Sequence, residues 1–365
     1  MSSTTSCNFD GFTAAPESLL LGEANAKRTV SAGRFHGSIA NLSTAHWDGN
    51  LGVLSRRRLQ RKSWVYGAVF SPRWIIGCAV VDAGLISSAF IYVYDRQTQQ
   101  FIERKAMRPL AFARDFKPQP NDVWTLSNGK EHWRIAPISK SESNGWQFQF
   151  DSADLKIDFT LSDNGSSISA LNNSPSSSHP NRSRPFHYTH KIAGLPAKLS
   201  LQMNGQYFNS DDAHEQNPVR GVFDFTLGYP PRSTLWQWLI WTGTLDDGRK
   251  ISGNLVAQTM NGLENAVWLE NANEKEPITI VGMPQTIFDY DPQNMQQAWH
   301  IHTVDQRLIL EFIPEGMRSE SIHLGILASD FTQPFGSLKG IWKDADGHAH
   351  AFTGIGVVEQ HRALW

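Results

Sequence analysis

The chain has 365 residues, of which 40% are hydrophobic and 19% are charged, and its formal net charge is −2. This composition permits a large buried core and excludes global disorder. The charge balance predicts no binding to nucleic acid or to an anionic membrane. Because no run of about 18 apolar residues occurs and residues 1–10 lack the features of a secretion signal, we expect a cytoplasmic protein without an integral membrane segment.

The first half of the chain contains β-strand patterns in chain order, beginning with residues 63–70, 74–82 and 87–94. These runs are rich in β-branched and aromatic side chains, and Ser71-Pro72 separates the first two. Further along, Trp146, Phe148 and Phe150 alternate with polar residues, and residues 155–161 repeat the pattern. Alternation of this kind predicts strands with one apolar face. Cys78 lies in the second run, so we expect a buried thiol that forms no disulfide with Cys7.

Residues 163–185 are rich in Ser, Asn and Pro, and we expect a flexible loop or linker there. The strand patterns then resume, with turn signals at Asp247-Gly248 and Asp346-Gly347. Many short strands predict an all-β fold of two antiparallel β-barrel or sandwich halves. We expect an N-terminal segment at 1–30 and β domains at 31–195 and 196–365.

One group of candidate site residues directly follows the expected loop. His187, Tyr188 and His190 offer two imidazoles and a phenol for proton transfer. On a strand, His187 would share a face with Thr189, and Tyr188 would share the other face with His190. The alternative is an ordinary strand in which these side chains are structural.

A second group centres on Asp224, which stands alone among apolar neighbours and precedes Arg232, Trp236 and Trp238. Burial of such a carboxyl raises its pKa unless a partner compensates, and a raised pKa suits a general acid. The alternative is a structural role for Asp224, either as an ion pair with Arg232 or as the cap of a turn.

Asn254, Glu264, Asn265 and Trp268 form a third group, whose polar members suit hydrogen bonds to a ligand at the mouth of a barrel. Turn formation is the alternative role for residues of these types.

The fourth group lies near the end of the chain, where Glu359 and His361 share a strand face and can pair. The alternative is an exposed C-terminal tail. The pairs His300/His302 and His348/His350 have a spacing that suits metal ligands, but no third ligand is evident, so we expect no metal and no cofactor.

Several stretches of the sequence resemble a bacterial family catalogued only as a domain of unknown function. The resemblance runs from about residue 30 to the end, and the family has no assigned activity. Its most specific parts are Glu264-Asn-Ala-Val-Trp268 and the closing Glu359-x-His361-x-x-x-Trp365.

The run from Asp224 through Trp236-Gln-Trp238 is also similar to carotenoid 1,2-hydratase (hydroxyneurosporene synthase), at the segment that opens its second domain. That superfamily includes isomerases and has two lipocalin-like (calycin-like) barrel domains around apolar ligands. The resemblance implies that Asp224 is a proton donor assisted by side chains of the 187–190 stretch. This chain departs from the pattern at Val222, where the hydratase has Tyr, and at His190, where it has Trp.

Three functions follow as hypotheses. The first is a cofactor-free lyase, hydratase or isomerase that protonates an apolar or polyene-like substrate from Asp224, with His190 and Tyr188 relaying the proton. The second is non-catalytic binding of a lipophilic ligand. The third is a carbohydrate-active enzyme that uses two of the carboxyls of Asp224, Glu264 and Glu359 on a Trp-lined cleft.

Overall fold

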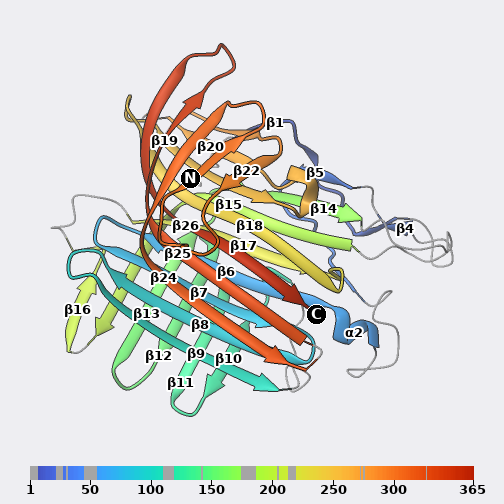
Figure 1. The fold of residues 1–365 in the computed structure, drawn as a ribbon, viewed down its shortest axis with the longest axis vertical. Helices are drawn as coiled ribbons and strands as arrows, with labels where there is room; N and C mark the ends of the chain where they lie inside the picture. The colour runs from blue at the N-terminus through green and yellow to red at the C-terminus, as the bar shows by residue number, and fades with distance from the viewer. Residues whose placement is uncertain are drawn as a thin grey trace.

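The computed structural model describes residues 7–21, 28–29, 32–44, 56–109, 119–140, 143–173, 186–203, 205–212, 219–271, 273, 276–325 and 327–365. Within these residues almost every regular element is a β-strand, and the strands form two large sheets (Figure 1). The expected all-β fold of two lipocalin-like halves is confirmed.

The first sheet is a nearly closed barrel. Its edge strands β9 (Gln100–Pro109) and β10 (Trp124–Asn128) approach each other, and the Arg108 guanidinium on β9 donates to the Ser127 carbonyl of β10 at 2.8 Å. Shorter strands extend the sheet: β14 (Ile168–Asn173), β5 (Gly33–His36), β2 (Thr13–Ala14) and β16 (Gln206–Asn209). The main path, in order of neighbours, is β10 (Trp124–Asn128), β11 (Glu131–Lys140), β12 (Ser143–Asp151), β13 (Leu155–Ser162), β15 (Phe186–Met203), β17 (Arg220–Gly228), β6 (Lys62–Phe70), β7 (Trp74–Asp82), β8 (Ile86–Asp95) and β9 (Gln100–Pro109).

Period-two alternation fills the inside of this barrel. The predicted rows on β12 and β13 point inward, so that Trp146, Phe148 and Phe159 are buried in one apolar core. Cys78 on β7 is a free, buried thiol in the same core, as expected.

The second sheet is a half-barrel with its own apolar core, which includes Trp241, Trp299 and Trp342. Its turns at Gly248 and Gly347 have positive φ, as the Asp-Gly signals predict. The path is β1 (Cys7–Asp10), β21 (Ile278–Gly282), β20 (Ala266–Glu270), β19 (Lys250–Ala257), β18 (Ser233–Leu245), β26 (Ala349–Leu364), β25 (Leu327–Lys343), β24 (Leu308–Leu324), β23 (Trp299–Thr303) and β22 (Thr286–Asp289).

The chain leaves the first sheet between Gly228 and Ser233, where β17 ends and β18 begins. The boundary that we expected near residue 195 falls inside β15. Part of the expected loop is β14, which pairs with β15 and β5 because Ile168, Ala170 and Leu171 are fully buried. Residues 174–185 of that segment lie outside the described residues.

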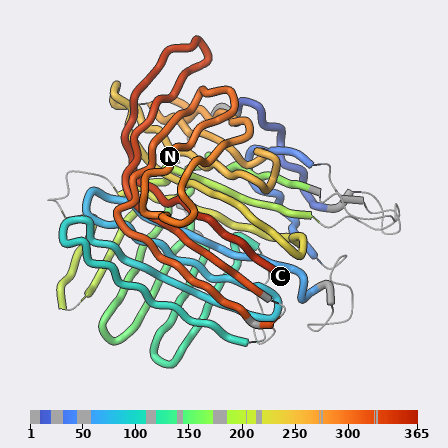
Figure 2. The backbone as a smooth tube through the Cα atoms, viewed as in Figure 1, coloured from blue at the N-terminus to red at the C-terminus, as the bar shows by residue number. Residues whose placement is uncertain are grey.

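A third apolar layer joins the outer faces of the two sheets. It packs Tyr66 and Tyr92 of the first sheet against Trp238 and Phe335 of the second. Figure 2 shows the long segments of β24, β25 and β26, in orange and red, passing from the second sheet across the first.

Each of these long strands therefore serves two layers. On β24, a register shift between Pro314 and Gly316 separates residues of the half-barrel core from residues that face the first sheet. Glu315 at this bulge accepts both arms of the Arg96 guanidinium at 2.7 Å. The bulge is thus anchored to β8 and its following turn.

Short elements complete the described structure: α2 (Arg56–Gln60), the 3₁₀ turn η2 (Met260–Gly262), β3 (Leu20–Leu21) and β4 (Arg28–Thr29). No helix in the described residues has the length and apolarity needed to cross a bilayer.

Candidate functional site

A cavity of about 650 Å³ lies where the two sheets meet. Its volume is within the range of small-molecule sites. The outer face of β6, β7, β8, β15 and β17 forms one wall, and β18 with the ends of β24, β25 and β26 forms the other. Aromatic side chains line much of it: Trp64, Tyr66, Phe90, Trp236, Trp238 and Phe331.

Strand alternation decides which side chains of the first sheet reach the cavity. On β15, Thr189 and Lys191 line the cavity, whereas Tyr188 and Ile192 enter the barrel core. On β17, Asp224 lines the cavity between neighbours that belong to the core. Because both faces of these strands are buried, polar residues on one face end up enclosed between the sheets.

Three enclosed charges of the cavity lie together: Lys191, Asp224 and Glu264, each less than 5% exposed. Lys191 lies directly opposite Asp224 across β15 and β17, and its Nζ is 2.6 Å from Asp224 Oδ1. Glu264 Oε2 lies 3.5 Å from the same ammonium group. The Trp64 indole N–H donates to the second oxygen of Asp224 at 3.2 Å.

Burial raises the pKa of Asp224, and the charge of Glu264 adds to this, while the contact with Lys191 opposes it. Burial lowers the pKa of Lys191, but Asp224 and Glu264 outweigh burial and the pKa is raised overall. The ammonium form of Lys191 is therefore stable, and it favours the ionised form of Asp224 2.6 Å away. Asp224 is thus a carboxylate of more than ordinary basicity.

Glu359 on β26 is the third enclosed carboxyl of the cavity. One of its oxygens accepts the Trp236 indole N–H at 2.8 Å, and the other accepts the Gln333 amide at 3.0 Å. Burial, with a smaller contribution from the charge of Asp224, raises the pKa of Glu359 to about 7, because it outweighs these two hydrogen bonds. This carboxyl therefore exchanges its proton near neutral pH.

The indoles of Trp64 and Trp236 lie between the carboxyls of Asp224 and Glu359 and bind one each. Their rings are stacked, with centroids 6.1 Å apart and an angle of 11° between the planes. One indole donates to Asp224 and the other to Glu359. An apolar ligand in the cavity would thus meet aromatic faces between two groups capable of proton transfer.

The histidines of the cavity are neutral at physiological pH. Burial lowers the pKa of His187 to about 4, and the charge of Lys191 contributes. Burial also lowers the pKa of His361 to about 3, with a contribution from Arg318. His361 Nε2 lies 2.8 Å from the Ser329 hydroxyl, which fixes its ring.

Eight of the residues singled out from the sequence line this cavity, from both halves of the chain. They are His187, Asp224, Arg232, Trp236, Trp238, Glu264, Glu359 and His361. Arg232 does not supply the expected partner of Asp224, because it binds the carbonyl oxygen of Trp365 while Lys191 pairs with the carboxylate.

Tyr188 and His190 lie elsewhere, because their shared face of β15 turns into the first barrel. The Tyr188 hydroxyl accepts the backbone N–H of Ile39 at 3.1 Å. His190 packs against Trp146 and Phe223, and burial lowers its pKa to about 3. These two side chains do not line the cavity that contains Asp224.

Asn254, Asn265 and Trp268 stabilise the region around the cavity without lining it. Asn254 accepts the Trp238 indole N–H at 2.7 Å and donates to the Glu264 carbonyl at 2.9 Å. The Asn265 side chain accepts the backbone N–H of Val256 at 2.7 Å, and the Trp268 indole donates to the Ser166 carbonyl at 2.7 Å.

The structure adds residues that we did not single out from the sequence, notably Lys191, Trp64 and Gln333. Period-two spacing from His187 and Asp224 could have indicated Lys191 and Thr226. Trp64 and Gln333 reach the site only through pairing between distant strands, which no local pattern reveals.

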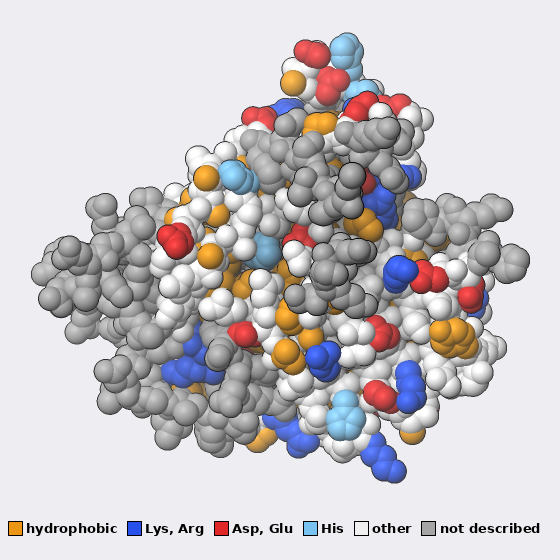
Figure 3. Space-filling view, turned by 180° about the vertical axis from the view of Figure 1, so that it is seen from behind, with side chains coloured by type: hydrophobic (Ala, Val, Ile, Leu, Met, Phe, Trp, Pro, Cys, Tyr) orange, Lys and Arg blue, Asp and Glu red, His pale blue; other side chains and the backbone are white. Residues whose placement is uncertain are grey.

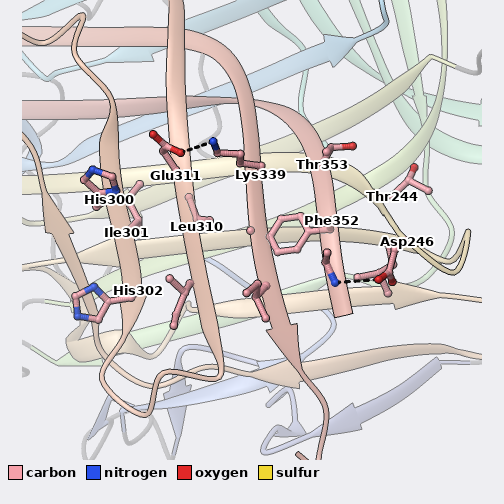
Figure 4. Close-up of a pocket in the computed structure, with 15 residues that line it drawn as sticks. Thr244, Asp246, His300, Ile301, His302, Leu310, Glu311, Lys339, Phe352 and Thr353 are labelled. Atoms are coloured by element: carbon pink, nitrogen blue, oxygen red, sulfur yellow. Dashed lines mark hydrogen bonds and ion pairs between the residues drawn. The ribbon is translucent and has the colours of Figure 1, made fainter. Parts of the chain in front are cut away.

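A second hollow, of about 640 Å³, lies on the half-barrel and contains His300 and His302 (Figure 4). Two of its charged groups, Lys339 and Glu311, form an ion pair at 2.8 Å. Figure 4 shows the two histidines on the same strand, and His300 is directly opposite Glu311 on the neighbouring strand. Among the described residues, neither histidine belongs to a cluster of three potential metal ligands.

Two such clusters do occur at turns of the half-barrel: Asp246, Asp247 and His350, and Asp344, Asp346 and His348. Acidic and histidine side chains gather at the upper tip in Figure 3. Arg249 binds Asp247 at 2.6 Å and so already neutralises one member of the first cluster. Neither cluster lines the cavity between the sheets.

The comparisons place the chain in a family. Residues 37–365 match the model of a domain of unknown function, DUF2804, and the chain belongs to that family. This confirms the resemblance noted in the sequence. No curated protein matches the chain.

Solved structures are similar to this chain at low sequence identity, and the first of them shares its fold. Kievitone hydratase from Nectria haematococca is 11% identical, with a TM-score of 0.51 over 96% of this chain and 98% of that one. A putative AttH from Nitrosomonas europaea is 12% identical, with a TM-score of 0.45 over 82% of this chain and 91% of that one. CghA is 8% identical, with a TM-score of 0.44 over 98% of this chain and 97% of that one.

Proposed function

We propose that this protein binds an apolar, unsaturated small molecule between its two sheets and acts on it as a cofactor-free hydratase, lyase or isomerase. The observation that carries the proposal is the pair of buried carboxyls, Asp224 and Glu359, on one aromatic-lined cavity. Proton transfer to carbon needs a neutral acid in a site shielded from water, and Glu359 with a pKa of about 7 meets that need.

The two carboxyls have different roles in this proposal. Glu359 donates its proton to one carbon of a double bond, and positive charge develops on the other carbon. The stacked faces of Trp64 and Trp236 stabilise that charge. Asp224, which Lys191 keeps ionised, accepts the proton that is released.

Hydration and isomerisation differ in the source of the proton that Asp224 accepts. In hydration, the oxygen of a water molecule bonds to the cationic carbon, and Asp224 takes the proton that the water loses. In isomerisation, Asp224 takes a proton from a neighbouring carbon and the double bond reforms there. Exchange with solvent then returns a proton to Glu359 in either case.

Asp224 thus becomes the base rather than the donor that the sequence resemblance implied. The reason is its 2.6 Å contact with Lys191, which favours the charged form. No ammonium or guanidinium group forms an ion pair with Glu359 among the described residues, and burial there outweighs the two hydrogen bonds and the charge of Arg318. The fold shared with kievitone hydratase is compatible with this chemistry but is not evidence for it, because proteins of one fold catalyse different reactions.

Non-catalytic binding of a lipophilic ligand is the second candidate, since the aromatic walls alone suffice for it. The carbohydrate hypothesis loses support for the pair of Asp224 and Glu264, because the Lys191 ammonium binds both carboxylates.

The test is incubation of the full-length protein in D₂O with fractionated extracts of unsaturated metabolites, followed by mass spectrometry. We expect a product with one non-exchangeable deuterium, formed by wild type and by the control Glu311→Gln in the second hollow. Glu359→Gln should form none. Incorporation at the wild-type rate by Glu359→Gln refutes its role, and absence of incorporation with a bound ligand favours the second candidate.

A further inference from the structure

Two threonines in the cavity wall have no part in the proton transfer proposed for Glu359 and Asp224. Thr189 and Thr226 are directly opposite each other across β15 and β17, and both line the cavity. Each residue is only 2% exposed. Neither Oγ1 atom has a hydrogen-bond partner among the described residues of the chain.

Buried hydroxyls without partners are rare, because removal from water is unfavourable unless another group takes the hydrogen bond. Here the two residues lie side by side on the faces of neighbouring strands that line the same cavity. Cβ atoms of directly opposed residues are about 4.5–5.5 Å apart. One oxygen atom placed between the hydroxyls can therefore contact both at ordinary hydrogen-bond length.

The neighbouring residues define what that atom would be. Lys191 and Asp224 form the next rung on the same face, about 7 Å along the strands. The ammonium of Lys191 is already engaged by Asp224 and Glu264, so it is not available to an anion at the threonines. Two hydroxyls that can each donate or accept suit a neutral oxygen that does both.

We propose that Thr189 and Thr226 form an oxygen subsite that holds a water molecule, or a hydroxyl group of the ligand, beside Asp224. This inference rests on the proposed function and extends it. With water in the subsite, the O–H bond that breaks gives its proton to Asp224, and the oxygen forms the new bond to the carbon next to the one protonated by Glu359. The subsite thus fixes where oxygen is added.

The test is a high-resolution crystal structure of the full-length, ligand-free protein and of matched variants. In wild type we expect one ordered oxygen within about 3 Å of both Oγ1 atoms. Thr226→Val and Thr189→Val should each lose it, whereas Thr226→Ser, which restores the hydroxyl, and Thr353→Val, in the second hollow, should retain it. Crystals soaked in 2-propanol separate the two sources, because an alcohol oxygen replaces the water only if the subsite accepts a ligand hydroxyl.

No ordered oxygen between the hydroxyls in wild type, or an unchanged oxygen in both valine variants, would overturn the inference. This outcome differs from failure of the proposed function. An oxygen in the subsite of a protein that incorporates no deuterium would leave the subsite in place and remove the hydratase and isomerase. Deuterium incorporation by a protein without that oxygen would support the hydratase or isomerase and overturn the subsite.

Discussion

Replacement of Glu359 by Gln should change how stability depends on pH, and the structure gives the magnitude. Burial raises the pKa of Glu359 from 4.5 to about 7 in the folded protein. The folded state therefore binds the proton more tightly than the unfolded state does. This contribution to stability is fully present below pH 4.5 and is lost as the pH rises through 7.

At about 1.4 kcal/mol for each pKa unit, the loss between pH 4.5 and pH 8 is about 3 kcal/mol. Glu359→Gln cannot titrate, so it lacks this loss. For a chain of this length, about 3 kcal/mol corresponds to a difference of about 4 °C in melting temperature.

The assay is thermal unfolding of wild type and Glu359→Gln across this pH range. Groups that titrate in both proteins cancel in the difference between them. We expect the variant to gain about 4 °C relative to wild type from pH 4.5 to pH 8. If the melting temperatures of the two proteins changed in parallel with pH, the pKa of Glu359 would not be raised. The assignment of Glu359 as the acid would then be wrong. Glu311→Gln, in which an exposed ion pair is removed, serves as the control.

Further predictions concern the other charged groups of the cavity. Lys191→Met leaves Asp224 and Glu264 without a counter-ion, so we expect the free energy of unfolding to fall by about 3–5 kcal/mol in chemical denaturation. The double variant with Asp224→Asn should recover part of this loss, and no recovery would contradict the ion pair. Trp236→Phe removes the N–H donor to Glu359 and should raise the pKa of Glu359, so that its contribution to stability is lost at a pH above 7. Loss at an unchanged pH would show that this hydrogen bond has no effect on the carboxyl. Asp224→Asn should abolish deuterium incorporation from D₂O while a ligand still binds, and full incorporation would remove Asp224 as the base.

The strands were largely predictable from local pattern. The expected runs at 63–70, 74–82 and 87–94 correspond to β6, β7 and β8, because their aromatic and β-branched residues fill the barrel core and the layer between the sheets. The Asp-Gly signals lie at turns between paired strands for the same local reason. A local pattern does not specify which sheet a strand joins, so the division between β17 and β18 was not foreseen.

The site was predictable in part. The sequence indicated that His187 and Tyr188 lie on opposite faces of a strand, which the structure confirms. It could not indicate which face meets the cavity, because both faces of β15 are buried. The contact between Lys191 and Asp224 depends on the register of two strands separated by a long segment, and on the shift between Ala193 and Leu195.

Native mass spectrometry of the full-length protein after exposure to a metabolite extract tests the central claim, that the cavity between the sheets is the ligand site. Val256→Trp adds a large ring to the cavity wall, and Thr353→Trp adds the same ring to the second hollow. We expect wild type and Thr353→Trp to carry the same small molecule and Val256→Trp to lose it. Equal retention by Val256→Trp, or loss only in Thr353→Trp, would contradict the account.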